Sequence, residues 1–158
     1  MFLPRHSFSS VVFDSLFYVM GGWTGDRNTD TVEVWDPGNL LWAKKLKMPR
    51  LLSDVTATVV GNIAIVTGGR IGNTDRVKHV TTEVWSFNPI SASWTPLPPM
   101  PFPREHHVQQ VVDGILIAAG GENQEGPVLE MWLYDIESQT WSVAAPLPKP
   151  RIEAAIAL

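Results

Sequence analysis

The stretch LFYVMGG, residues 16–22, runs five apolar residues into two adjacent glycines. The same shape returns as IAIVTGG at 63–69 and ILIAAGG at 115–121, so the glycine pairs are 47 and 52 residues apart. A Gly-rich turn after a strand can hold a phosphate, but the turn must then open a helix whose free N–H groups face the anion. Here each pair leads into another extended segment, and no GKS or GKT follows. We therefore expect these glycines to serve the backbone, where it takes positive φ or passes close to another strand.

A tryptophan follows each glycine pair, and the distance from the first glycine to Trp42, Trp94 and Trp141 is 21, 26 and 21 residues. The longer middle gap holds an insertion, RIGNTDRVKHVTT at 70–82. Two-residue links typical of β-hairpins join the first two segments of each unit: Asp14-Ser15, Gly61-Asn62 and Asp113-Gly114. Each unit therefore reads as four short antiparallel strands. Its near-continuous apolar runs favour strands that are covered on both faces.

Two further features repeat along the chain. An aromatic residue followed by Asp or Asn precedes each tryptophan, as in WDP at 35–37, FNP at 87–89 and YDI at 134–136. Pro-Arg pairs punctuate the units at Arg5, Arg50, Arg104 and Arg151. Together with the glycine pairs and the spaced tryptophans, this pattern resembles the kelch repeat family over the whole chain. The sequence departs from the pattern in three places: Trp35 and Phe87 stand where the usual tyrosine would, which keeps the aromatic bulk, YDI lacks its proline, and KMPRLLSD is shortened.

The resemblance implies an all-β fold, a kelch-type β-propeller segment of three four-stranded antiparallel blades in an incomplete ring. The expected repeats span about 5–49, 50–103 and 104–150, and 151–158 would be the first strand of a fourth. The three spaced tryptophans would pack between blades, and the four Pro-Arg arginines would share one structural position. Three alternatives remain for the whole molecule: a fragment of a longer propeller, self-association of two chains to complete a ring, or an open arc. We expect an isolated chain that is not a stable monomer.

Composition narrows the function classes. The net charge of −4 and the lack of a basic block do not favour nucleic acid as a partner. The chain has no cysteine, so disulfides, thiolate zinc sites and a cysteine nucleophile are excluded. No signal-peptide core and no apolar run near the ~20 residues of a membrane helix is present, which predicts no membrane partner and favours the cytoplasm. Without HxH, HExxH or GxSxG, we predict no enzyme activity, no metal and no cofactor.

In the expected strand order, the loops between second and third strands emerge on the same side as the links between units. Kelch domains of the adaptor type bind partner proteins or peptides with such a face, and loops on a rigid scaffold commonly carry function. The candidate partner-binding residues on this face are Trp23, Arg27, Arg70, Arg76, Lys78, His79, Arg104, His106, Glu122 and Asn123. Trp23 has no counterpart in the other units. Arg70, Arg76 and His79 lead the set because their loop carries the insertion.

A second function class stays open at this point. Some propellers that resemble the kelch type act on sugars, so the chain could belong to a galactose oxidase-like or sialic acid epimerase-like enzyme, or to a carbohydrate-binding protein. The oxidase type resembles this sequence only in its blades. Its copper centre uses a Tyr–Cys cross-link, which a chain without cysteine cannot form.

Overall fold

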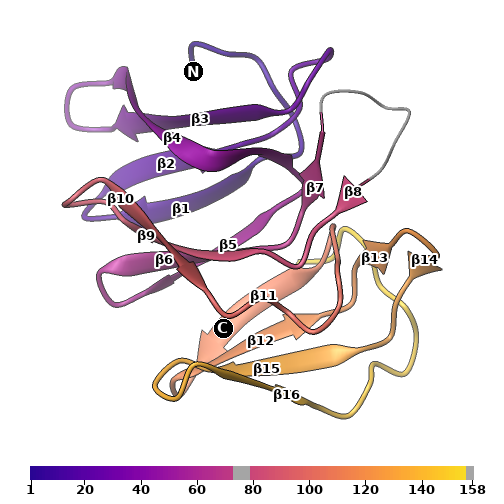
Figure 1. The fold of residues 1–158 in the computed structure, drawn as a ribbon. Coiled ribbons are helices and arrows are strands. Elements are labelled where there is room, and N and C mark those ends of the chain that lie inside the picture. The colour runs from indigo at the N-terminus through magenta and orange to yellow at the C-terminus, as the bar shows by residue number, and fades with distance from the viewer. Residues whose placement is uncertain (73–78, 156–158) are drawn as a thin grey trace.

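The computed structural model describes residues 1–72 and 79–155, and it shows three consecutive antiparallel β-sheets (Figure 1). Blade 1 consists of β1 (Ser9–Phe13), β2 (Leu16–Met20), β3 (Thr29–Asp36) and β4 (Leu41–Ser53). Blade 2 consists of β5 (Thr56–Val60), β6 (Ile63–Thr67), β9 (Val84–Asn88) and β10 (Ser93–Leu97). Blade 3 consists of β11 (Val108–Val112), β12 (Ile115–Ala119), β15 (Met131–Asp135) and β16 (Thr140–Val143). The predicted propeller segment of three antiparallel blades is confirmed.

Two short hairpins lie outside the regular blade pattern. β7 (Arg70–Ile71) pairs with β8 (His79–Val80), and β13 (Glu122–Asn123) pairs with β14 (Gly126–Pro127). Both belong to loops between second and third strands, at the same end of the blades (Figure 1). In the described part of the chain, no helix is long and apolar enough to cross a membrane.

The two-residue hairpin links are confirmed in every blade. The last residue of each first strand pairs with the first residue of the next, as in Phe13 with Leu16. Asp14 and Ser15 both take positive φ, at 44° and 66°, as the turn that matches the twist of two strands requires. These turns lie at the end of the blades opposite to β7 and β13 (Figure 1).

The core lies between blades rather than inside one sheet. One cluster joins blades 1 and 2 and includes Tyr18, Val34 and Phe87, all buried, with Trp94 packed against it. A second cluster joins blades 2 and 3, and Trp141 packs against it while its Nε1 donates a hydrogen bond to the Pro98 carbonyl oxygen at 3.0 Å. The prediction that the spaced tryptophans pack between blades is therefore confirmed for Trp94 and Trp141, because a sheet covered on both faces buries both sets of side chains. The Trp42 ring instead contacts Phe17 of its own blade, with ring centroids 6.5 Å apart.

The glycine pairs are the points at which consecutive blades are joined. The N–H of Gly22 donates to the Leu52 carbonyl oxygen at 2.8 Å, and the N–H of Gly69 donates to the Arg104 carbonyl oxygen at 2.9 Å. Gly21 and Gly22 have φ of +65° and +104°, and a Cβ added at Gly21 would lie 2.5 Å from the Leu52 oxygen. Positive φ and close backbone approach both require glycine, so the predicted backbone role is confirmed.

Replacing Gly21 with alanine is expected to lower the free energy of unfolding by about 1–3 kcal/mol, because the new Cβ meets a buried carbonyl and is strained at positive φ. Gly61→Ala is the matched control: Gly61 also has positive φ, but no atom lies within 4 Å of an added Cβ. Urea unfolding of both variants separates the contact from the strain. Equal losses in the two variants would show that the close approach to Leu52 costs nothing.

The link between blades 1 and 2 differs from the expected loop. β4 is 13 residues long and continues past its blade, where Leu52 pairs with Ile71 of β7. The sheet of blade 1 therefore has six strands, ending in β7 and β8. The insertion at 70–82 supplies this extra hairpin, which gives the backbone of the link its hydrogen-bond partners.

The Pro-Arg arginines do not all share one position, so that prediction is wrong for Arg50. Arg5 Nη1 donates to the carbonyl oxygens of Gly21 and Thr31 at 2.8 Å each. Arg104 Nη1 makes the same two bonds 99 residues later, to Gly120 and Glu130 at 3.0 Å each. In the link between blades 1 and 2, Leu52 occupies the backbone position that matches Arg104. The Leu52 carbonyl accepts the Gly22 N–H, as the Arg104 carbonyl accepts the Gly69 N–H. Arg50 lies two residues earlier with its side chain 56% exposed.

Candidate functional site

One position in each repeat lies just before the first strand, at the end of the blades that carries the long loops. Its occupants are Ser7, Asp54, His106 and Glu153, which we call the mouth residues because the first strands β1, β5 and β11 begin beside them. All four take positive φ between 50° and 56°. Backbone hydrogen bonds join them in two pairs: the Asp54 N–H donates to the Ser7 oxygen at 2.8 Å, and the Glu153 N–H donates to the His106 oxygen at 3.1 Å. The repeat thus presents four different side chains at equivalent positions.

Sequence reasoning selected only His106 among the mouth residues. The signal that could have found the others is their spacing, because Ser7, Asp54 and His106 each precede the first glycine of a pair by 14 residues. Their chemical diversity hid the pattern, since no residue type recurs. The backbone conformation is shared and the side chains vary, which is what a variable contact position on a fixed scaffold requires.

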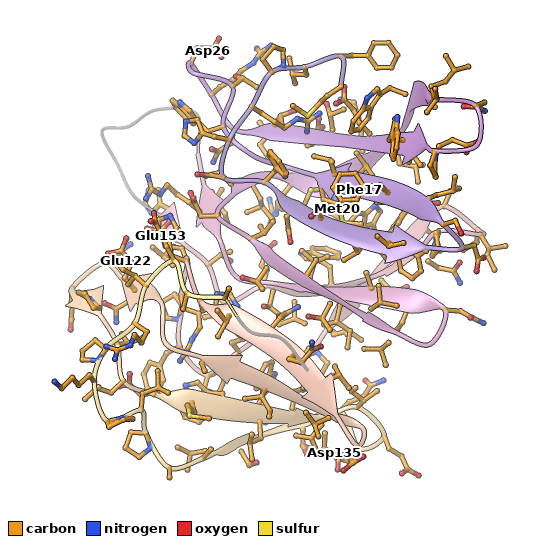
Figure 2. The ribbon with its side chains drawn as sticks, turned by 180° about the vertical axis from the view of Figure 1, so that it is seen from behind. Phe17, Met20, Asp26, Glu122, Asp135 and Glu153 are labelled. Carbon is orange, nitrogen blue, oxygen red and sulfur yellow. The ribbon has the colours of Figure 1, made fainter. Side chains whose placement is uncertain are left out.

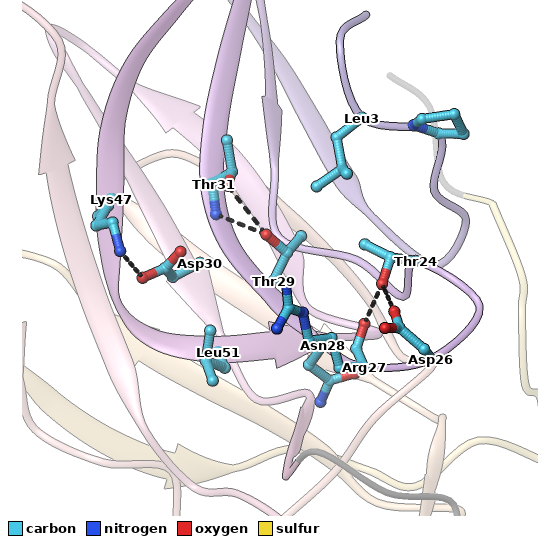
Figure 3. Close-up of a pocket in the computed structure, with 11 residues that line it drawn as sticks. Leu3, Thr24, Asp26, Arg27, Asn28, Thr29, Asp30, Thr31, Lys47 and Leu51 are labelled. Atoms are coloured by element: carbon cyan, nitrogen blue, oxygen red, sulfur yellow. Dashed lines mark hydrogen bonds and ion pairs between the residues drawn. The ribbon is translucent and has the colours of Figure 1, made fainter.

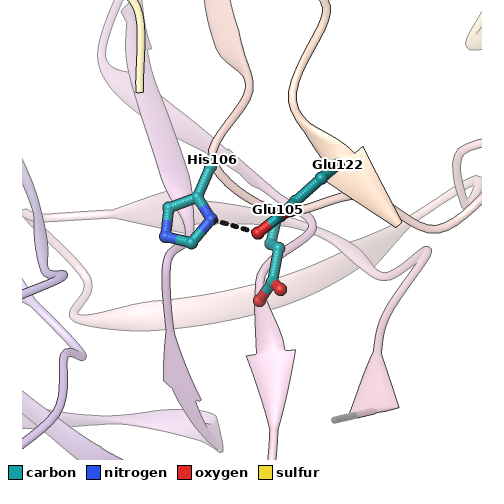
Figure 4. Close-up of side chains that lie close together, drawn as sticks. All are labelled: Glu105, His106 and Glu122. Carbon is teal, nitrogen blue, oxygen red and sulfur yellow. Dashed lines mark hydrogen bonds and ion pairs between the residues drawn. The ribbon is translucent and has the colours of Figure 1, made fainter. Parts of the chain in front are cut away.

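His106 connects three loops by hydrogen-bonded ion pairs. Its Nε2 lies 2.8 Å from Asp54 Oδ1. Its Nδ1 lies 3.1 Å from Glu122 Oε1, the pair drawn in Figure 4. The hydrogen bond to Asp54 outweighs desolvation and raises the pKa of His106 to about 9. Burial acts to raise the pKa of Asp54, but hydrogen bonds from His106, Ser53 and Ser7 hold it at about 2. At neutral pH the site therefore contains an imidazolium between carboxylates.

A second ion pair fixes Arg70. Its Nε and Nη2 donate to the two carboxylate oxygens of Glu105 at 2.8 and 2.9 Å, and the Glu105 side chain is fully buried. The Arg70 carbonyl oxygen accepts a hydrogen bond from Asn28 Nδ2 at 2.8 Å. The bonds to Glu105 raise the pKa of Arg70. Arg70 is thus held in one orientation by loops from blades 1 and 3.

Trp23 lines the same hollow as members of these ion pairs. Its backbone exchanges hydrogen bonds with that of His6 at 3.0 and 2.8 Å, and the residue is half-buried. A hollow of about 200 Å³ opens here, lined by His6, Ser7, Trp23, Ser53, Asp54, Arg70 and His106. Residues from all three blades therefore meet at one depression on the loop end of the molecule.

A larger hollow of about 750 Å³ lies over the loop and links of blade 1 (Figure 3). Arg27 and Asp26 lie at one side and Lys47, paired with Asp30 at 3.1 Å, lies at the other. Leu51 adds an exposed apolar side chain to the lining. The Thr24 hydroxyl is uncharged, but it hydrogen-bonds the Asp26 carboxylate and the Arg27 carbonyl oxygen and so fixes the shape of this loop.

The remaining predicted residues are spread over the same end. Glu122 lies near the mouth residue Glu153 at this end, whereas Asp135, which was not selected from the sequence, marks the opposite end of blade 3 (Figure 2). His79 is exposed in β8, and Asn123 is half-buried with its Oδ1 accepting the Glu125 N–H at 2.8 Å. The Arg104 side chain faces inward and is 1% exposed as a residue, so it offers no contact surface. Arg76 and Lys78 lie outside the described residues.

Glu105, His106 and Glu122 bring one potential metal ligand atom each within 4.8 Å of one another (Figure 4). Both oxygens of Glu105 already accept hydrogen bonds from the Arg70 guanidinium. A cation at this point would be repelled by Arg70 and by the charged His106. The cluster is therefore better described as an ion-pair network than as a metal centre.

Comparison with known proteins agrees with the geometry. The family model of the kelch motif matches residues 4–46 and 51–101. Kelch-like protein terF of Aspergillus terreus is 27% identical over 165 residues, which cover 96% of this chain and 36% of that protein. Kelch repeat and BTB domain-containing protein A55 of vaccinia virus is 28% identical over 141 residues, covering 89% of this chain and 24% of that protein.

A solved structure, that of YjhT, superposes with a TM-score of 0.82 at 18% identity, covering 93% of this chain and 54% of YjhT. This similarity concerns the fold alone. The chain spans between a quarter and about a third of the length of the two curated relatives named above.

Proposed function

The chain belongs to the kelch repeat family, and on that premise we propose that it is a protein-interaction module that binds a partner protein or peptide through the loop end of its blades. The observation that carries the proposal is the meeting of loops from three blades at the mouth residues, beside Trp23 and Arg70. Ion pairs between loops hold Arg70, Asp54 and His106 in place before any partner arrives. Binding then costs less conformational entropy than it would with free side chains.

The two hollows define the surface that we propose for the partner. The small one offers Trp23 for stacking and the polar mouth residues, and the large one offers an open groove edged by Arg27 and Leu51. Tryptophan and arginine are the residue types that contribute most often to binding free energy at interfaces. Of the residues proposed from sequence, Trp23, Arg27, Arg70 and His106 line these hollows. His79, Glu122 and Asn123 lie at the same end of the blades without lining either hollow. The buried Arg104 is left out.

A peptide display library selected on the immobilised chain tests the proposal. Peptides that bind the native chain are expected to lose affinity by about tenfold or more for the double variant Trp23→Ala and Arg27→Ala, because two anchors are removed. Neither residue belongs to the buried ion pairs, so the fold should remain. Circular dichroism and thermal unfolding check this point.

Ile90→Ala is the matched control, because Ile90 is 81% exposed in the turn between β9 and β10 at the opposite end of the blades. Its peptide affinity should equal that of the native chain. Peptides that bind the double variant as tightly as the native chain, or that depend on Ile90, would place the binding surface elsewhere. A library that yields no binders would contradict the proposed function itself.

A further inference from the structure

In the described part of the chain, blades 1 and 3 each have one neighbouring blade, so each has one end face outside the core (Figure 1). On blade 1, four side chains form a row across the sheet, in which each residue is the cross-strand partner of the next: Val12, Phe17, Trp35 and Trp42. None of the four belongs to either core cluster of the described residues. Val12 is 58% exposed, and the three aromatic residues are half-buried. We call this row the end face of blade 1.

The repeat shows what such a row packs against. The equivalent rows are Val59, Ala64, Phe87 and Trp94 in blade 2, and Val111, Leu116, Tyr134 and Trp141 in blade 3. Both rows belong to core clusters that join them to the preceding blade, and Phe87 and Tyr134 are fully buried there. Trp35 holds the same position in blade 1 but is only half-buried. The end face of blade 1 therefore has the form of a face that receives a preceding blade.

Blade 3 has the opposite kind of face. Ile117 and Leu133, which are cross-strand partners, are half-buried, and Val112 at the end of β11 is 38% exposed. We call these three residues the end face of blade 3. The same positions in blade 1 pack against the row of blade 2 and are buried, and their occupants are Tyr18, Val34 and Phe13. The end face of blade 3 therefore has the form of a face that packs on a following row.

We propose that two copies of this chain associate head to tail, with the end face of blade 3 in one copy packed on the end face of blade 1 in the other. Both faces consist of uncharged apolar side chains, aromatic on blade 1 and aliphatic on blade 3, and contact removes them from water. A contact between unlike faces forms a ring when the rotation between copies closes. The chain superposes on 54% of YjhT, so two copies have slightly more than the length of that chain. A second copy thus continues the packing already present between blades.

The C-terminal segment must give way to the second copy. The Arg151 carbonyl oxygen accepts an N–H from the glycine pair of blade 3 at 2.6 Å, and the Glu153 N–H donates to the His106 oxygen at 3.1 Å. Arg5 and Ser7 hold the equivalent positions before blade 1, so in the second copy they can replace both bonds. Arg151 is exposed and its Nη1 donates to the residue before it, whereas Arg5 is anchored by two carbonyls of its own blade. Ser7 of the second copy would then stand beside His106, and both copies would contribute mouth residues to one face.

Sedimentation velocity of the whole chain over a range of concentrations tests the proposal. The native chain should reach a mass of twice 17.5 kDa. Val12→Glu and Val112→Glu should each weaken association by about tenfold or more, because each places an unpaired carboxylate in the apolar contact. Both side chains are exposed in the single copy, so the fold should remain, and circular dichroism checks this. Ile90→Glu is the matched control, because Ile90 is an exposed apolar residue in a turn of blade 2 and belongs to neither end face.

Mixing the two variants tests the head-to-tail arrangement. The Val12→Glu chain keeps its blade 3 face and the Val112→Glu chain keeps its blade 1 face, so the mixture should form a dimer held by one intact contact. A native chain that stays monomeric at every concentration would overturn the inference, as would a mixture that stays monomeric. Association that resists Val112→Glu or Val12→Glu would show that like faces pair or that the contact lies elsewhere. Peptide binding is measured separately by display, so either proposal can fail without the other.

Discussion

Glu33→Ala is expected to lower the free energy of unfolding by about 3–5 kcal/mol, because it leaves a buried guanidinium without its counter-charge. Arg5 Nη2 lies 3.0 Å from Glu33 Oε2, and both side chains are fully buried. Glu33 Oε1 also accepts the backbone N–H groups of Phe2 and Leu3 at 3.0 and 3.1 Å. Removing the carboxylate therefore releases both the charge partner of Arg5 and the N-terminal segment. Urea or thermal unfolding measures the loss.

Glu83→Ala is the matched control in the next blade. Glu83 pairs with Arg50 at 3.2 Å, but the side chains are 26% and 56% exposed, and such surface pairs contribute about 0–1 kcal/mol. The double variant Arg5→Leu with Glu33→Leu should recover part of the loss, since it removes both buried charges together. A Glu33→Ala variant that loses no more than Glu83→Ala would show that the buried pair carries no special weight.

Stability is expected to fall as pH decreases from about 6.5 toward 3, and His107 is the reason. Its pKa is lowered to about 3 in the folded chain, first by burial, whereas the ordinary value is about 6.5. In this window the unfolded chain binds a proton that the folded chain does not. The free energy of unfolding therefore drops with decreasing pH by up to about 1.4 kcal/mol per unit from this residue alone. Chemical unfolding at pH 6.5, 5.5 and 4.5 measures the slope.

His107→Gln is the control for the loss of stability below pH 6.5. It removes the titrating imidazole, so the free energy of unfolding should change less with pH between 6.5 and 4.5. Asp54 does not affect the free energy of unfolding in this pH window. Its lowered pKa stabilises the fold above pH 3.8, and that stabilisation is lost only as pH falls toward 2. His6→Gln, at an exposed residue, should keep the native slope. An unchanged slope in His107→Gln would contradict the assignment.

At alkaline pH, the free energy of unfolding is expected to fall as pH rises, because of His106. Its pKa is raised to about 9 in the folded chain, first by the hydrogen bond to Asp54, so its stabilising charge is fully present below pH 6.5. That contribution is lost as pH rises through 9. Two adjacent histidines thus limit stability on opposite sides of neutrality, because one is buried away from counter-charge and the other is held by carboxylates.

Much of the fold could be predicted from residues close together in sequence. The pairing of Phe13 with Leu16 follows from a two-residue turn, and the role of Gly21 follows from a repeat without a helix. Blade-to-blade packing of Trp94 and Trp141 follows from their fixed place in each unit. The residues that set a turn or a strand lie within about ten positions of one another, so the sequence alone is enough to predict these elements.

The site could be predicted only in part. Arg70 and His106 were found because they lie on loops at the expected end, but Arg104, in the same set, turned out to be buried. Asp54 was not selected, although its Oδ1 binds His106, because those residues are 52 positions apart and share no motif. The sequence also did not reveal that Arg50 lies two residues before the position equivalent to Arg104, because the Pro-Arg pair is present there.

The sequence by itself determined the strands, the turns, the three-fold repetition and the end of the blades on which the long loops lie. Only the tertiary structure decided which side chains meet. Stacking of the blades brings equivalent backbone positions of different repeats together. In the link between blades 1 and 2, the hydrogen bond from the Gly22 N–H to the Leu52 carbonyl oxygen sets the register, rather than the Pro-Arg pair at Arg50. The pairing of His106 with Asp54 and the contact of His107 with Thr67 arise from that stacking, because residues of different repeats meet only in the packed blades.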